Sequence, residues 1–325
     1  MKSAAFYQNN IDRGLENRSC CIIHLQSINR QFWLFPLQVS FFKRCLAGVC
    51  YPVWTQWRGL YRIFMINALI FDLDDTLVIE EASAEASFIE TGELAQARYG
   101  LDPRELHATL RKVCRELWYA SPWHPFCKRV GISSWEGLWA EFIGADPNLK
   151  ELRHWAPVYR FESWQSALRC SGIEDRQLAV ELAETFPRLR RQKHIVYPDA
   201  IPVLKELSRI YSLGLLTNGA PDLQKRKLEG SGIAAFFNQV LISGEFGIGK
   251  PDKRIFQMLL SQLKADPETT LMIGNSLSTD IAGAQEAGLR TVWLNRAGKT
   301  RDNSIEPDWE ITGLMELTPI LAGLK

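Results

Sequence analysis

Three carboxylates fall within four positions of the stretch ALIFDLDDTLV, residues 68–78, namely Asp72, Asp74 and Asp75. They follow a continuous apolar run of strand length, which is typical of a parallel strand covered on both faces. Ligands bind at the carboxyl ends of such strands, and acids that meet there repel one another unless a cation lies among them. Mg²⁺ fits, because it takes one or two carboxylates together with phosphate oxygens and water. The alternative is that Asp72 or Asp75 only caps the next segment.

Other predicted strand ends carry hydroxyl, amide, ammonium and carboxylate groups, in this order: Thr217, Asn218 and Gly219, then Lys250, then Asn275 and Asp280. A hydroxyl beside glycine and backbone donors suits phosphate oxygens. An ammonium neutralises both a phosphate and an attacking carboxylate. Each motif alone is weak, since a Thr-Asn-Gly is usually a turn and a lysine is usually solvated. Their order and their shared place at strand ends predict a site for phosphoryl chemistry.

The segments that position these groups alternate between strands and helices from residue 66 onward. Apolar runs predict strands over residues 67–72, 212–219, 239–245, 269–275 and 290–295. Helical patterns lie between them, over residues 198–210, 221–231, 253–264 and 278–287. This alternation predicts an α/β fold, a doubly wound parallel sheet with helices on both faces.

One long interval, residues 81–195, contains no strand-like run. Its amphipathic patterns predict helices over residues 81–100, 102–120, 133–144 and 176–192, and we expect Trp135 and Trp139 to pack in its core. The sequence therefore predicts two domains besides the N-terminal leader. The core comprises residues 65–80 and 196–325, and a helical cap of residues 81–195 is inserted into it.

The leader, residues 1–64, is basic, with eight Lys or Arg and two acids. No apolar run in it reaches the ~18 residues that span a bilayer. It is either a targeting or membrane-surface segment, or a stretch ahead of a natural start at Met65, and we favour the second reading. The seven cysteines follow no zinc or disulfide pattern, which favours reduced thiols and a cytoplasmic location. A net charge of +1 predicts no nucleic-acid partner, and we expect no membrane partner either.

The motifs resemble those of the haloacid dehalogenase-like hydrolases. The stretch DLDDT, with Asp72, Asp74 and Thr76, is highly specific for this family. Thr217 and Lys250 match the second and third family motifs, and GNSLSTD, residues 274–280, matches the fourth. The resemblance covers about residues 66–300, and the helical interval resembles the cap of the family's first subtype, known as C1.

The resemblance implies a role for each motif residue. Asp72 would be the nucleophile that becomes an aspartyl phosphate, and Asp74 would act as acid and then as base. Thr217 and Lys250 would stabilise the transferring group. The implied metal is Mg²⁺, held by Asp72, the Asp74 carbonyl, Asn275 and Asp280. The implied contacts to substrate or phosphate are Thr76, Asn218, Gly219 and His124, with Lys128 and Arg129 as further cap candidates.

Two alternatives to a phosphatase stay open. Dehalogenating relatives lack an acid two residues after the nucleophile, so Asp74 argues against a 2-haloacid dehalogenase. Family phosphatases usually carry an acid where this chain has Asn275, so a non-catalytic phosphate-binding relative is the second alternative. The cap and GIGKPD, residues 247–252, are loosely similar to those of N-acylneuraminate-9-phosphatases and phosphoserine phosphatases. The expected partner is a small phosphorylated metabolite, phosphoserine or a sugar phosphate, and no pattern indicates an oligomeric state.

Overall fold

A computed structural model describes residues 44–46, 49–51, 65–301 and 304–324 of the 325-residue chain. The chain divides into two units, residues 1–61 and 62–325. In the first unit, β1 (Arg44–Leu46) and β2 (Val49–Tyr51) form an antiparallel hairpin. The rest of the predicted leader lies outside the described residues. Within the described ranges, no helix is both long and apolar enough to cross a membrane.

The second unit is built on a six-stranded sheet in the order β5-β4-β3-β6-β7-β8, and every neighbouring pair is parallel. The strands are β3 (Ala68–Phe71), β4 (Ser212–Thr217), β5 (Gln239–Ile242), β6 (Thr270–Gly274), β7 (Arg290–Leu294) and β8 (Trp309–Ile311). The predicted α/β class is confirmed. Two details differ from the prediction. The strand predicted over residues 239–245 ends at Ile242, where the short helix α9 (Ser243–Phe246) begins. Strand β8 was not predicted, because three residues are too few to show a period in the sequence.

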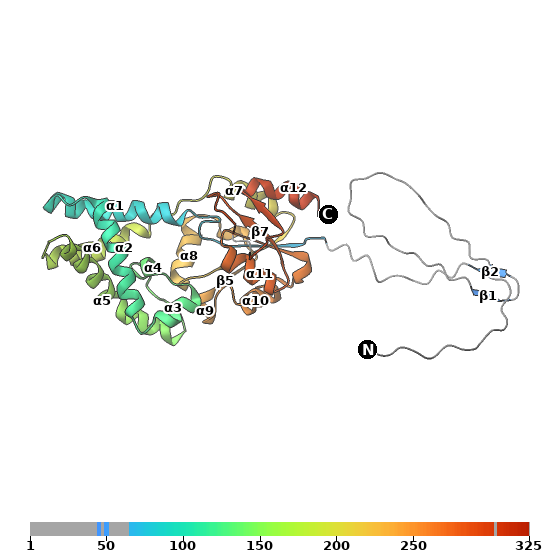
Figure 1. Cartoon of the computed structure of the whole chain (residues 1–325), viewed down its shortest axis with the longest axis horizontal. Coiled ribbons are helices and arrows are strands. Elements are labelled where there is room, and N and C mark those ends of the chain that lie inside the picture. The colour runs from blue at the N-terminus through green and yellow to red at the C-terminus, as the bar shows by residue number, and fades with distance from the viewer. Residues whose placement is uncertain (1–43, 47–48, 52–64, 302–303, 325) are drawn as a thin grey trace, which may run out of the picture. The chain divides into compact units, whose positions relative to one another are not determined.

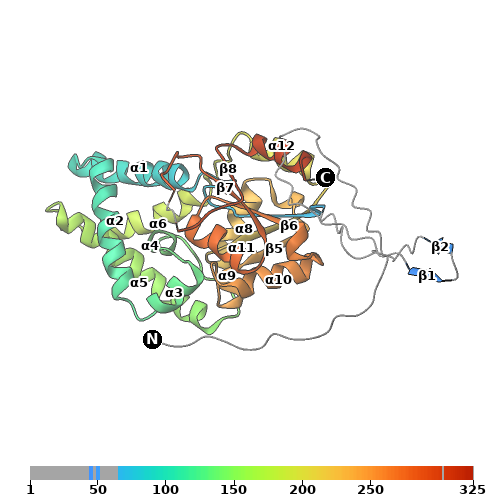
Figure 2. The ribbon, with the colours of Figure 1, turned by 45° about the vertical axis from the view of Figure 1, so that its right-hand side comes forward.

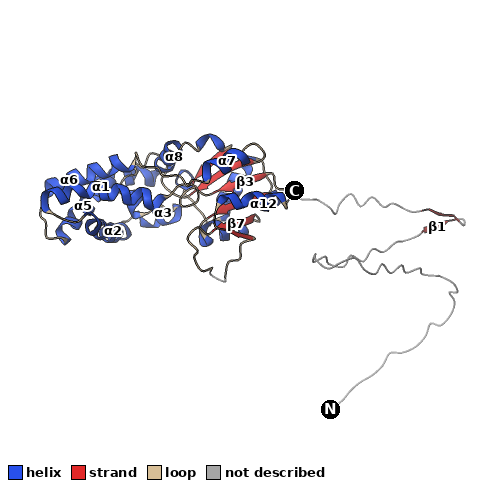
Figure 3. Cartoon of the chain, turned by 90° about the horizontal axis from the view of Figure 1, so that it is seen from above, coloured by secondary structure: helices blue, strands red, loops and turns tan. Residues whose placement is uncertain are grey.

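Helices cover both faces of the sheet, as Figure 3 shows with strands and helices in separate colours. The helices of this part are α7 (Ala200–Leu207), α8 (Pro221–Gly230), α10 (Lys253–Leu263), α11 (Ala282–Glu286) and α12 (Leu317–Ala322). Alternate residues of β3 enter different clusters, since Leu69 and Phe71 pack with α7 and α12 whereas Ile70 packs with α10. This alternation is the period-2 geometry of a strand buried on both faces. Short 3-10 turns span Ala234–Phe236, Pro267–Thr269 and Leu314–Glu316.

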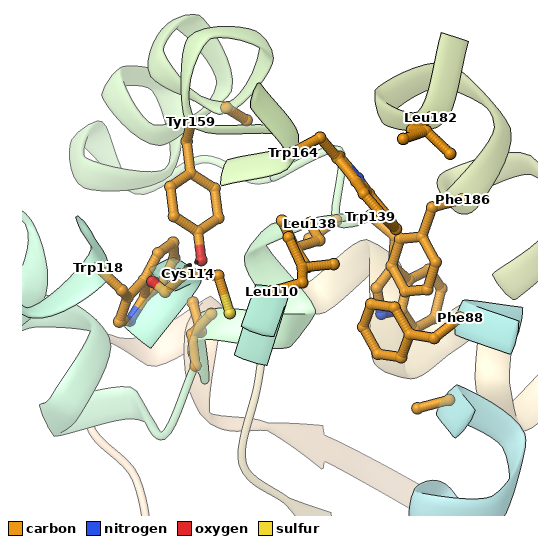
Figure 4. Packing of buried hydrophobic residues seen from close by; sticks show 14 of the residues in the cluster. Phe88, Leu110, Cys114, Trp118, Leu138, Trp139, Tyr159, Trp164, Leu182 and Phe186 are labelled. Carbon is orange, nitrogen blue, oxygen red and sulfur yellow. Dashed lines mark hydrogen bonds between the residues drawn. The ribbon is translucent and has the colours of Figure 1, made fainter. Parts of the chain in front are cut away.

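Between β3 and α7 lies a group of helices that we call the helical insert. It comprises α1 (Glu80–Tyr99), α2 (Pro103–Ala120), α3 (His124–Val130), α4 (Ser134–Gly137), α5 (Pro147–Cys170) and α6 (Arg176–Arg190). In Figures 1 and 2 its long helices gather apart from the strands. It has its own core, in which Phe88 and Phe186 stack at 4.1 Å and the Tyr159 hydroxyl donates to the Cys114 carbonyl (Figure 4). Such stacking stabilises an aromatic core beyond the area it buries.

The predicted helix over residues 133–144 is wrong beyond Gly137. The Asp222 carboxylate of α8 accepts hydrogen bonds from the backbone N–H groups of Glu141 and Ile143. These N–H groups therefore bond to the core and not within a helix of their own. Phe142 between them has φ +53°, which no α-helix allows. Helix α5 was not predicted, because Pro157 interrupts its pattern. As expected, Trp139 is buried, whereas Trp135 is only half-buried.

The loop after α3 brings the helical insert against the core. The Gly219 N–H and the Ser243 hydroxyl both donate to the Val130 carbonyl, at 3.1 and 2.5 Å. The next residue, Gly131, has φ +73°, and a Cβ there would lie 2.7 Å from the Asn218 Cβ. Only glycine combines this backbone conformation with so close an approach. The insert therefore meets the core beside the ends of β4 and β5.

Candidate active site

The carboxyl ends of β3, β4 and β6 open into one cavity of about 260 Å³, which we call the catalytic cavity. Most of the residues predicted for the site line it: Asp72, Asp74, Thr217, Asn218, Lys250, Asn275 and Asp280. The helical insert contributes the opposite wall, with Ser133, Trp135 and Glu136 among its residues. Groups from five separate stretches of sequence thus meet in one place.

Asp72 is the first residue after β3. Its backbone N–H still donates to the Ile273 carbonyl at 3.0 Å, so the sheet fixes where its side chain begins. The Thr76 hydroxyl donates to Oδ2 at 3.0 Å, and Lys250 Nζ lies 2.5 Å from Oδ1. Burial raises the pKa of Asp72 to about 7, although the Lys250 charge lowers it. Both carboxylate oxygens have fixed partners, which orients the group toward the cavity.

Lys250 is buried, and its backbone is clamped by one side chain. The Lys250 N–H donates to Asn218 Oδ1 at 2.8 Å, and Asn218 Nδ2 donates to the Lys250 carbonyl at 2.9 Å. Lys250 Nζ contacts the Asp72 carboxylate, the Asp280 carboxylate at 2.7 Å and the Leu216 carbonyl at 2.8 Å. Burial lowers the pKa of this ammonium, but its two carboxylates together raise it above the ordinary value. The lysine therefore carries a fixed positive charge.

Asp280 and Asn275 lie beyond the end of β6. Asp280 is buried in a π-helical turn (Leu277–Ile281), a feature frequent at functional sites, and its Oδ2 accepts from the Ser276 N–H at 2.9 Å. A Cβ on Gly274 would lie 2.4 Å from this carboxylate oxygen, so the strand end must be glycine. The Asn275 carbonyl accepts from Trp293 Nε1 at 3.0 Å, and Asn275 lines the cavity.

The donor set suits Mg²⁺, although no three acidic, imidazole or thiol groups converge on one point among the described residues. Lys250 Nζ lies between the Asp72 and Asp280 carboxylates. Those two carboxylates share the cavity with the amide of Asn275 and with Asp74. Mg²⁺ needs only one or two carboxylates, and takes its other oxygens from carbonyl groups, phosphate and water. The residues present therefore fit a magnesium ion.

Asp74 points toward a second group of charges. Its Oδ2 accepts from Gln224 Nε2 at 2.8 Å, and its Oδ1 accepts from Lys227 Nζ at 2.9 Å. Gln224 Nε2 also donates to the Thr217 hydroxyl at 2.7 Å, so one amide connects two predicted site residues. Gln224 and Lys227 were not predicted. The signal that could have found them is their place on the buried face of α8, between Leu223 and Leu228.

Lys227 has no exposed side-chain surface and joins the core to the helical insert. Besides Asp74 it pairs with Glu80, at the start of α1, at 3.0 Å, and with Glu136, in α4, at 3.5 Å. The fully buried Arg190 of α6 pairs with Glu80 at 2.6 Å. Burial lowers the pKa of Lys227, but the three carboxylates raise it above its ordinary value. We call Lys227, Arg190 and the three carboxylates Asp74, Glu80 and Glu136 the Lys227 cluster. Asp72, Lys250 and Asp280 form the Lys250 cluster.

Three residues predicted to bind phosphate or substrate lie outside the wall of this cavity. The hydroxyl of Thr76 is taken by Asp72. The N–H of Gly219 donates to Val130 and to the Ser243 hydroxyl. His124, on α3, lines a neighbouring cavity of the helical insert. Their roles as ligand contacts stay predictions.

An α/β sheet with an acid pair at the end of its first core strand, a lysine against the first acid and a helical insert defines a class of hydrolases. The chain belongs to the haloacid dehalogenase-like hydrolases, whose family model matches residues 66–288. The predicted family is thus confirmed, and the chain is an enzyme of the hydrolase class.

Three similar proteins narrow the comparison. The phosphoserine phosphatase of Thermus thermophilus is 38% identical over 253 residues, which are 78% of this chain and 98% of the relative. The mouse N-acylneuraminate-9-phosphatase is 27% identical and covers 82% of this chain and 96% of its own. The crystal structure of the HAD-hydrolase YfnB from Bacillus subtilis, bound to magnesium, matches with a TM-score of 0.57 and 25% identity, over 79% of this chain and 99% of that one.

Proposed function

We propose that the protein is a Mg²⁺-dependent phosphatase that hydrolyses a small phosphate monoester through an aspartyl phosphate on Asp72. The observation that carries the proposal is the shared cavity of Asp72, Asp74 and Lys250 at the end of β3. Two carboxylates and an ammonium are the nucleophile, the acid–base group and the charge neutraliser that this reaction needs. The names of the similar phosphatases support it.

Asp72 and Asp74 then act in both halves of the reaction. An Asp72 oxygen forms the bond to phosphorus while the ester oxygen leaves, and the Asp74 carboxyl gives that oxygen a proton. In the second half, the Asp74 carboxylate takes a proton from water, whose oxygen bonds to phosphorus and displaces the Asp72 oxygen. Lys250, which already contacts Asp72, and Thr217 stabilise the charge on the transferring group. Splitting the hydrolysis in this way replaces one difficult step by two easier ones.

Asp72, the Asp74 carbonyl, Asn275 and Asp280 are the groups that would hold Mg²⁺. When bound, the ion polarises phosphoryl oxygens and offsets the charge that the cavity acids carry. The amide of Asn275 offers an oxygen without charge, and we infer that Asp280 supplies a correspondingly larger share of the binding.

The proposed substrates are phosphoserine and sugar phosphates, on the analogy of the similar enzymes. The helical insert would act as the cap, residues 81–195, that covers the catalytic cavity and excludes water from it. Trp135 and Glu136 already form part of the wall. We place the enzyme in the cytoplasm, in keeping with its free thiols, among them Cys114 and Cys127.

The test is hydrolysis of phosphoserine, several sugar phosphates and p-nitrophenyl phosphate by the full chain, with Mg²⁺ and with EDTA. Asp72→Asn should abolish turnover, and EDTA should do the same. Asp75→Asn is the matched control. Asp75 has φ +55°, a conformation that asparagine tolerates, and its carboxylate bonds to the Glu80 N–H, so this variant should stay active. Equal activity of Asp72→Asn and the unchanged chain would overturn the proposal.

Two alternatives have their own outcomes in this experiment. A 2-haloacid dehalogenase would release chloride from 2-chloropropionate in EDTA and would tolerate Asp74→Asn. A non-catalytic relative would bind phosphate, with no turnover of any ester at millimolar Mg²⁺. The Asp74 side chain, held by Lys227 and Gln224 at the cavity wall, supports the phosphatase over both.

A further inference from the structure

A second cavity, of about 370 Å³, lies beside the catalytic cavity and is formed entirely by the helical insert. Helices α2 and α3 and the loop that leads into α4 form its wall. Three residues, Gly131, Ser133 and Trp135, line both cavities. The two spaces therefore share one stretch of wall along this loop. We call the second space the basic cavity.

The name follows from its charges. Arg111, Arg115, His124 and Lys128 line the basic cavity, and no carboxylate does. Arg111 pairs with Glu81, which does not line the cavity, whereas no ion pair joins Arg115 or Lys128 to an acid within the described part of the chain. In a chain whose net charge is only +1, four basic side chains around a cavity with no carboxylate in its wall make a local positive field.

Two helices, α2 and α3, carry these basic side chains. Arg111 and Arg115 are four residues apart on α2 and so lie on one helix face. The Arg111 guanidinium lies over the Trp135 ring, 4.7 Å from its centroid, and that ring is shared with the catalytic cavity. From α3, His124 packs against Tyr119 at 4.7 Å. The basic groups thus line the same cavity as Trp135, whose ring also lines the catalytic cavity with Asp72 and Lys250.

We propose that the basic cavity binds a second anionic group of the substrate, so that the enzyme acts on phosphate monoesters that also carry a carboxylate or another anion. The inference rests on the proposed function, which places the phosphoryl end at Asp72. Guanidinium groups bind planar carboxylates with two parallel hydrogen bonds, and such charge-assisted bonds are the strong ones. The acids of the site, Asp74 and Glu136 among them, line only the catalytic cavity, so the two ends of a substrate meet opposite fields.

Matched esters test the inference with the full chain and Mg²⁺. O-phosphoserine and O-phosphoethanolamine differ by one carboxylate, and 3-phosphoglycerate carries a carboxylate where glycerol 3-phosphate has a hydroxymethyl group. Fructose 1,6-bisphosphate and fructose 6-phosphate differ by a second phosphate. We expect kcat/KM to be at least about tenfold higher for the more anionic member of one or more pairs. The pair that shows the difference identifies a carboxylate or a phosphate as the second group. Equal values within every pair would overturn the inference.

The double variant Arg115→Gln, Lys128→Gln asks whether the basic cavity causes the difference. Its ratio of kcat/KM within the preferred pair should fall toward one. Lys112→Gln, an exposed position on α2 that lines neither cavity, is the matched control and should keep the ratio of the unchanged chain. An unchanged ratio in the double variant would place the discrimination elsewhere and overturn the inference.

Failure of the proposed function has a different signature. If no ester is hydrolysed, or if Asp72→Asn matches the unchanged chain, the phosphatase proposal fails. Calorimetric titration with 3-phosphoglycerate and with glycerol 3-phosphate then tests, by binding alone, whether the basic cavity binds a second anionic group. Tighter binding of the carboxylate, lost in the double variant, would support the inference. Equal Kd values for the two esters would overturn it.

Discussion

The Lys250 cluster and the Lys227 cluster are built alike and positioned differently. Each centres on a buried lysine, and each holds one more carboxylate than cations. The partners of Lys250 are the ends of β3 and β6, so this cluster lies within the core and faces the catalytic cavity. The partners of Lys227 come from the β3 loop, α1 and α4, so this cluster joins the core to the helical insert, although its carboxylates also line the catalytic cavity.

The comparison shows that a buried lysine among carboxylates can serve either catalysis or the joining of two parts of the fold. A buried ion pair contributes little net stability, because desolvation offsets the attraction, but removing one partner is costly. In the Lys250 cluster the extra negative charge faces a space that Mg²⁺ and phosphate can share. In the Lys227 cluster the two cations, Lys227 and Arg190, are enclosed at the junction, and the most exposed member is Asp74, at 25% of its side chain. We therefore expect Lys250 to matter most for turnover and Lys227 for folding.

The largest effect should come from Lys227→Met, which leaves three carboxylates without their shared cation. The free energy of unfolding should fall by about 3–5 kcal/mol, the cost of breaking a buried pair. Urea unfolding followed by circular dichroism measures it. Lys225→Met, which removes an exposed lysine of the same helix α8 that pairs with Glu245 of α9, should cost far less. A loss below about 1 kcal/mol, the range of surface pairs, would contradict the assigned difference.

Lys250→Gln should have the opposite balance of effects, with a large loss of turnover and a small loss of stability. Loss of the ammonium should lower kcat by about 10²–10³, the range for removing one preorganised stabilising donor. Unfolding should change less than in Lys227→Met, because burial raises the pKa of Asp72 to about 7 and that carboxyl can take up a proton. Steady-state kinetics on the best ester measures the loss. Lys253→Gln, whose exposed lysine pairs with Glu286, is the control, and similar kcat values for both variants would refute a role in turnover.

The same contrast explains what the sequence could predict. Asp72, Lys250 and Asp280 follow predicted strand ends, so a parallel sheet brings them together whatever the details. Lys227 and Glu136 have no such rule, since they meet only when the helical insert folds back on α8. The failed helix over residues 133–144 has the same origin, because a carboxylate of α8 takes the backbone donors of that segment. Contacts within the sheet were predictable, and contacts across the junction were not.

A smaller effect should come from alanine substitutions at two glycines with positive φ. They distinguish backbone strain alone from strain combined with a contact between the helical insert and the core. Gly131 and Gly172 have φ of +73° and +75°, and alanine in this conformation costs about 1–2 kcal/mol. Gly172 has nothing within 4 Å of the added Cβ, whereas at Gly131 it meets Asn218, which clamps the Lys250 backbone. Both alanine variants should be destabilised, and only Gly131→Ala should also lose kcat. Equal kcat in the two would show that the junction does not reach the Lys250 cluster.

The smallest effect should come from Asn275→Asp, which adds a carboxylate beside the Lys250 cluster. If Asn275 is a weak neutral ligand, the added charge should lower the Mg²⁺ concentration for half-maximal rate several-fold, because ligand charge tunes affinity for hard cations. Ser278→Asp adds the same charge at an exposed position that does not line the cavity, and should leave the requirement nearly unchanged. If both variants lowered the Mg²⁺ requirement equally, the effect would come from long-range attraction of the ion by the added charge and not from a ligand at position 275. An unchanged requirement in Asn275→Asp would remove Asn275 from the proposed metal ligands and leave the excess carboxylate of the Lys250 cluster as the main attraction for the ion.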